Sequence, residues 1–177
     1  MSKQTVGLIV MTVGALLGVA RPPAAQASSR TDHQERRYHV LMTGAARIAL
    51  VESLLGAMRR LSRPECQHLF EDFTDHAGRT LTINLEAIAQ SPADVLVGLD
   101  FVNGDDTPRC RTDGAVVAFT KPGSRVIHVC GQRFVQFAGH TKGGEVLLIH
   151  ELLHSLGLGE NPPTSSRITN AVINRCG

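Results

Sequence analysis

The stretch EVLLIHELLHSL, residues 145–156, constrains the fold more than any other part of this 177-residue chain. Its apolar residues recur at helical spacing and cover most of the helix surface, which predicts a helix buried at the centre of a core. Among these apolar side chains stand His150, Glu151 and His154. Imidazoles and carboxylates are costly to bury without a partner. The core must therefore form around this helix and must also supply partners for its polar side chains.

His150 and His154 lie four residues apart, so they share one face of the helix, one turn from each other. Two imidazole nitrogens at that spacing can bind one zinc ion. Glu151 follows the first histidine and is placed to take a proton from a metal-bound water. Chance alone gives this H-E-x-x-H pattern in roughly 2 of 100 such chains, so it favours a zinc site. The alternative is that both histidines bond to neighbouring groups or face solvent.

The longer run HELLHSLGLGE, residues 150–160, resembles the signature of the metzincin clan of zinc metallopeptidases, H-E-x-x-H-x-x-G-x-x-H or D. The resemblance implies that His150 and His154 are zinc ligands and that Glu151 is the general base. It also implies that Gly157 reverses the chain sharply and that Glu160 takes the third ligand position. Glycine tolerates positive φ and commonly closes a helix, which agrees with this mapping.

The chain departs from the family pattern at two points. Glu160 stands where the family has His or Asp, although two histidines and a glutamate are a known catalytic zinc shell. The family also has a methionine-containing turn after the signature, whereas no methionine follows Met58 here. The resemblance covers the active helix and its turn. The C-terminal run from HELLHSLGLGENPP is also similar to that of small exported bacterial proteins of unassigned activity.

The N-terminus has the pattern of a secretory signal peptide over residues 1–27. Lys3 precedes an apolar run over residues 6–20, and Ala25-Gln26-Ala27 forms the cleavage pattern. The apolar run is shorter than the ~20 residues that span a bilayer. We expect cleavage after Ala27, a secreted or periplasmic protein without a stable membrane anchor, and a flexible segment over residues 28–37.

Charge and cysteine content bound the partners and the compartment. Loss of Lys3 and Arg21 with the signal peptide balances the basic residues against the 16 acidic ones, which argues against nucleic acid as a partner. An even number of well-separated cysteines in an exported chain predicts two disulfides. Three pairings are possible, and the preferred one joins Cys110 to Cys130 and Cys66 to Cys176.

Residues 38–177 are predicted to form one α+β domain of zincin-like architecture. We expect a small mixed sheet packed on a long helix, with a central active-site helix and a short C-terminal helix. The expected helices lie within residues 40–61, with Thr43-Gly44 as a candidate cap at the start, and at 81–88, 145–156 and 165–175, with a helical turn at 132–137. The expected strands cover 94–102, 115–120 and 125–130, the last two as a hairpin or as neighbours.

Other polar residues have an ordinary interpretation and a functional one. Asn161 is a rival third ligand or a turn residue before two prolines. Six further residues could take part in catalysis or in a second metal site, but ordinary core, loop or surface roles are favoured for them. They are Tyr38, Asp72, Asp75, His76, His128 and His140.

The sequence thus predicts a secreted, monomeric zinc metallopeptidase acting on peptide or protein substrates. One alternative is a zinc-stabilised, non-catalytic binding module whose fourth metal position is filled by protein. Another is a zinc amidase acting on a non-peptide or cell-wall amide, which shares the bond-breaking chemistry. Substrate and cleavage preference are not encoded in any motif of the chain.

Overall fold

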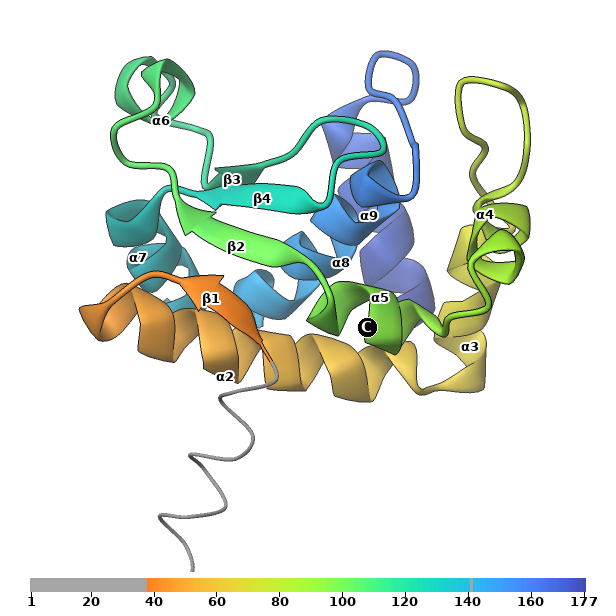
Figure 1. Ribbon diagram of the computed structural model, residues 1–177, viewed down its shortest axis with the longest axis horizontal. Helices are drawn as coiled ribbons and strands as arrows, with labels where there is room; N and C mark the ends of the chain where they lie inside the picture. Colours follow the sequence, from red (N-terminus) through yellow and green to blue (C-terminus); the bar gives the residue numbers. More distant parts are fainter. Residues whose placement is uncertain (1–37, 141) are drawn as a thin grey trace, which may run out of the picture.

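The computed structural model describes residues 38–140, with only the backbone of His140, and residues 142–177. The expected signal peptide (1–27) and flexible segment (28–37) lie outside these described residues. The described part is a mixed α+β structure in which helices pack on one face of a small sheet (Figure 1). This agrees with the α+β class expected from the sequence.

The sheet has four short strands in the order β1-β2-β4-β3. The first three in this order are parallel, and β3 pairs antiparallel with β4 at the edge. One face is buried against the helices, because Val40, Phe101, Ile127 and Val129 alternate with more exposed residues. The strands are β1 (His39–Leu41), β2 (Asp100–Asn103), β3 (Ala118–Phe119) and β4 (Val126–Val129).

Helix α8 (Gly143–Ser155) lies at the centre of the core, as its all-round apolar sequence predicts. Leu148, Ile149, Leu152 and Leu153 are fully buried. No helix in the described part of the chain is long and apolar enough to cross a membrane. The other helices are α2 (Gly44–Leu61), α3 (Pro64–Gln67), the 3-10 helix η1 (His68–Phe70), α4 (Leu81–Ala87), α5 (Pro92–Val97), α6 (Pro108–Thr112), α7 (Gly131–His140) and α9 (Ser165–Cys176).

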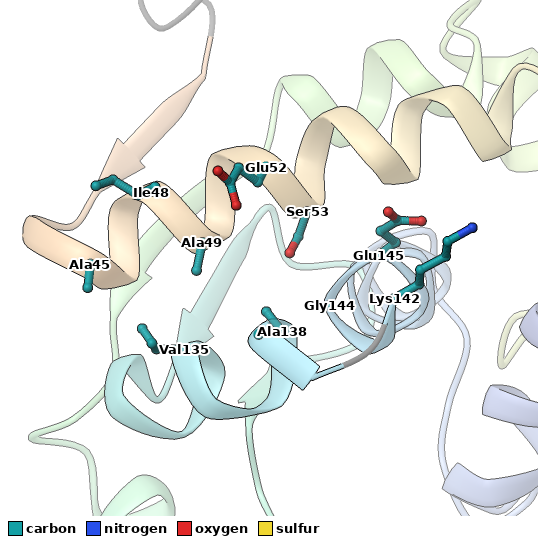
Figure 2. Close-up of a pocket in the computed structure, with 11 residues that line it drawn as sticks. Ala45, Ile48, Ala49, Glu52, Ser53, Val135, Ala138, Lys142, Gly144 and Glu145 are labelled. Carbon is teal, nitrogen blue, oxygen red and sulfur yellow. The ribbon is translucent and has the colours of Figure 1, made fainter.

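Small residues allow α8 to cross the long helix α2 closely. A side chain at Gly144 would collide with Ser53, which Figure 2 shows directed from α2 towards the start of α8. One turn further along α2, Gly56 leaves room for Glu145, whose carboxylate pairs with Arg60. This crossing fixes the direction in which α8 presents its histidines to the rest of the molecule.

The predicted strand over residues 94–102 is wrong for its first half. The chain forms α5 there and enters β2 only at Asp100. Ser91 caps the helix by accepting the N–H of Asp94, and Pro92 occupies the first helical turn. These two start signals outweigh the β-propensity of the valines that follow. The long helix predicted within residues 40–61 begins at Gly44, with Thr43 at the N-cap position as expected, and Val40 belongs to β1.

The other expected elements are found with shifted ends. The runs at 115–120 and 125–130 contain β3 and β4, which form the antiparallel hairpin. The helical turn expected at 132–137 is longer and forms α7, and the expected helices at 81–88 and 165–175 correspond to α4 and α9.

Two disulfides tie the fold together in the preferred pairing. Cys66–Cys176 links α3 to the end of α9, and Cys110–Cys130 links α6 to the residue after β4. Disulfides of this kind are consistent with an extracellular protein. The first one holds α9 beside α8, and the second one holds α6 above the edge of the sheet.

Candidate metal centre

Helix α8 places His150 and His154 on one face, and both imidazoles are buried. Their Nε2 atoms lie 3.0 Å apart. Nδ1 of His154 lies 2.8 Å from the carbonyl oxygen of Leu158, which can only accept, so Nδ1 carries the proton and Nε2 has a free lone pair. Nδ1 of His150 lies 3.0 Å from the hydroxyl of Thr169 on α9.

Both Nε2 atoms can act as metal ligands when Nδ1 of His150 donates to the hydroxyl of Thr169, which can either accept or donate. When both rings donate through Nδ1, two Nε2 lone pairs face each other, which is unfavourable unless a cation or a proton lies between them. Burial, and then repulsion from His154, lowers the pKa of His150 to about 4. When Nδ1 of His150 instead accepts from Thr169, its Nε2–H donates to Nε2 of His154, and the pair is satisfied without a metal ion. Hydrogen bonds between the Nδ1 atoms of the two histidines and Thr169 or Leu158 are of the type that orients metal-binding histidines.

Glu160 joins the histidines because the chain reverses after α8. Gly157 has a φ of +107° and ends the helix, as its position in the motif predicts. One ligand atom each of His150, His154 and Glu160 lies within 4.8 Å of the others. Both histidines are buried and the glutamate is exposed. The three residues predicted as ligands thus form a group that could hold a metal ion.

Asp75 holds this turn in place, a role that the sequence did not reveal. It forms an isolated β-bridge with Leu158, and it accepts a side-chain hydrogen bond from Asn84 at 3.1 Å. The same amide of Asn84 donates to the carbonyl of Leu156 at 2.9 Å. Hydrogen bonds, that from Asn84 above all, hold the pKa of Asp75 well below its usual range. The carbonyl that orients His154 is therefore fixed from outside the helix.

Glu151 lies beside the ligands with its carboxyl group nearly closed off from solvent, at 3% exposure. Burial, and then repulsion from Glu160, raises the pKa of Glu151 to about 8. Attraction to Arg109 and a hydrogen bond from the backbone N–H of Thr120 oppose this rise. Its Oε2 is buried and has no hydrogen-bond partner among the described residues. This unpaired oxygen is available for a hydrogen bond with a group in the adjoining cleft.

The ligands open onto a cleft of about 380 Å³. Edge strand β3 and the residues around it form one wall, and α8 and α9 form the other. Apolar side chains of Val117, Phe119, Phe137 and Leu147 line it, as does the cationic side chain of Arg109. The metal-ligand group is thus reached from solvent and lies next to a strand edge. No motif drew attention to Arg109 or Thr169, since single residues on short helices carry no pattern.

The remaining candidates lie outside the ligand group. Tyr38 is buried and donates to the sulfur of Met58. Asn161 has a φ of +60° and forms the expected turn before Pro162. His128 stacks on Phe119, with ring centroids 4.9 Å apart.

The possible second metal site is not formed. Asp72 pairs with Arg175, and Asp75 bonds to Arg79 and Asn84. His76 does not join them in a metal-binding group within the described residues. His140 ends α7, and its side chain lies outside the described part.

Comparisons with protein-family models, with curated proteins and with solved structures gave no match to this chain. The function must therefore be argued from the site itself.

Proposed function

We propose that this protein is an exported zinc-dependent metallopeptidase. The observation that carries the proposal is the meeting of His150, His154 and Glu160 beside Glu151, at the end of an open cleft. Two imidazoles and a carboxylate form a donor set of catalytic zinc sites, whereas calcium and magnesium prefer oxygen ligands alone. Three protein ligands leave one position for water or substrate, which is the mark of a catalytic site.

Glu151 is suited to the role of general base and then of general acid. Zinc, when bound, would supply the Lewis acidity that activates a water molecule and polarises the scissile carbonyl. Glu151 accepts the proton of the attacking water on its unpaired Oε2 and later returns it to the leaving amine. The pKa of about 8 belongs to the metal-free protein, and the positive charge of bound zinc would lower it, which leaves Glu151 ionised and able to accept the proton.

The wall of the cleft supports a peptide as the substrate. Strand β3 has one neighbour, β4, so the backbone groups on its other side are not used within the sheet. An extended peptide can pair with such an edge, while pockets beside it receive alternate side chains. The apolar side chains of Phe137 and Leu147 provide such a pocket. The same accessible cleft disfavours a closed structural zinc site, in which protein fills the fourth position.

Export is the setting in which this enzyme would act. Two disulfides among the described residues are consistent with an oxidising compartment, and the signal pattern over residues 1–27 supports the same conclusion.

The test compares the zinc-loaded, oxidised wild type with Glu151→Gln on a complex peptide mixture, with products identified by mass spectrometry. The variant should keep one zinc per chain and lose roughly 100- to 10,000-fold in turnover, because it lacks a proton acceptor. Glu86→Gln, an exposed change on α4, serves as the matched control and should behave as the wild type. Undiminished cleavage by Glu151→Gln would refute the mechanism. Zinc without cleavage of any peptide would favour the binding module or the non-peptide amidase.

A further inference from the structure

Arg109 is a cation held at the cleft by rigid surroundings. It lies on α6, whose first turn is capped by Thr107, with the hydroxyl accepting the N–H of Cys110 at 3.3 Å. The Cys110–Cys130 disulfide ties this helix to the sheet, and Arg133 donates to the carbonyl of Cys110. The backbone that carries Arg109 is therefore fixed relative to the cleft.

An aromatic stack positions the guanidinium group. Its central carbon lies 5.1 Å from the ring centroid of Phe119, which in turn stacks on His128. Arginine over an aromatic face keeps its planar N–H groups available at the edges. Phe119 lies on the edge strand that forms one wall of the cleft. Arg109 is thus preorganised rather than a freely moving surface side chain.

The charge of Arg109 has no ion-pair partner among the described residues. Glu151 is close enough for the two charges to attract, but it is buried and bonds to the N–H of Thr120. Asp113 also lines the cleft, but its carboxylate accepts the N–H of Ala115 at 3.0 Å. A preorganised guanidinium without a carboxylate of its own is suited to receive one from a ligand.

We propose that Arg109 is a specificity residue that binds a carboxylate of the substrate, so that the enzyme prefers anionic peptides. The carboxylate would belong either to an acidic side chain or to a free C-terminus, since both present the same planar pair of oxygens. This inference rests on the proposed function, because it assumes that a peptide occupies the cleft. Arg111, on the same helix, neither lines the cleft nor stacks on an aromatic ring, which makes it a matched control.

The test measures binding rather than turnover, so that it can be separated from the peptidase activity. Two pairs of peptide hydroxamates are titrated into the zinc-loaded protein by calorimetry. One pair differs only in Glu against Gln, and the other only in a free against an amidated C-terminus. The wild type should bind the anionic member of one pair roughly 10-fold more tightly, as expected for a charge-assisted contact at an accessible site. The pair that discriminates identifies the source of the carboxylate.

Arg109→Gln should abolish this discrimination, and Arg111→Gln should preserve it. Equal affinity of the wild type for both members of each pair would overturn the inference, as would binding of neither. A loss of discrimination in Arg111→Gln as large as in Arg109→Gln would also overturn it, since the effect would then reflect net charge alone. Discrimination without cleavage of any peptide would support the carboxylate site while refuting the peptidase. Cleavage without discrimination would support the peptidase while refuting the carboxylate site.

Discussion

At the scale of single residues, the site combines two buried groups whose pKa values are shifted in opposite directions. His150 has a pKa lowered to about 4, mainly by burial, so its folded form resists protonation. Glu151 has a pKa raised to about 8, also mainly by burial, so its folded form retains a proton. Both shifts keep His150 and Glu151 uncharged near pH 7 in the metal-free protein.

The pH dependence of the metal-free protein follows from these shifts. Between pH 6.5 and 8 the folded protein holds a proton on Glu151 that the unfolded chain has released, so stability falls as pH rises. His150 opposes this fall only weakly, by about 0.4 kcal/mol, because its unfolded form is half protonated at pH 6.5 whereas its folded form is already neutral. With zinc removed by chelation, the wild type should lose at most about 2 kcal/mol of unfolding free energy over this range.

Urea unfolding at both pH values measures this loss. Glu151→Gln cannot release a proton, so its stability should not fall between pH 6.5 and 8 and should rise by about 0.4 kcal/mol through His150. Glu86→Gln should retain the slope of the wild type. A slope that persists unchanged in Glu151→Gln would show that another group causes it.

At the scale of elements, the metal centre depends on how the end of α8 turns. Gly157 adopts positive φ, and a side chain added there would lie 3.2 Å from the Cβ of Asp75. Gly159, two residues on, has open space around it and no such backbone constraint. The turn carries the carbonyl of Leu158 towards His154 and the carboxylate of Glu160 towards both histidines. Strain at Gly157 should therefore disturb zinc binding as well as folding.

The matched pair Gly157→Ala and Gly159→Ala tests this dependence. Gly157→Ala should lower the unfolding free energy by roughly 1–2 kcal/mol, since alanine is strained at positive φ. It should also weaken zinc binding roughly 10-fold, because it displaces an orienting carbonyl. Gly159→Ala should be close to the wild type in both properties. Competition with a chromophoric chelator gives the affinities, and equal zinc affinity in the two variants would contradict the role assigned to the turn.

Local patterns in the sequence predicted the helices, the strands and the candidate ligand group better than they predicted the residues that hold the site in place. The spacing of His150, His154 and Glu160 with Gly157 between them identified the group, because a helix and a glycine turn are local features. The first half of the segment over 94–102 was predicted wrongly. Ser91 and Pro92 start a helix there, whereas the β-propensity of the following valines indicated a strand. Contacts made by distant segments, such as Asp75 with the turn, leave no periodic signal.

At the scale of the whole molecule, distant segments converge on α8. Thr169 reaches His150 from α9, which begins only after the turn. Helix α9 is fastened at its far end by the Cys66–Cys176 disulfide, with Arg60 and Arg63 donating to the carbonyl of Cys176. The covalent link therefore supports a histidine ligand indirectly, through the helix that carries its hydroxyl partner. Loss of this disulfide is therefore expected to weaken metal binding at the candidate site, which is the coupling proposed between the disulfide and the metal.

This coupling predicts unequal effects of the two disulfides. Cys66 and Cys176 are 110 residues apart, whereas Cys110 and Cys130 are 20 apart. Replacing the first pair by alanine should cost about 4–5 kcal/mol and the second about 3 kcal/mol, because the longer loop gains more entropy when released. Zinc affinity should fall more for the first pair, since α9 then holds Thr169 less firmly. Chelator competition on the folded fraction of each variant measures this difference. Equal zinc affinities would show that α9 stays in place without its disulfide, and that the support of His150 comes from packing alone.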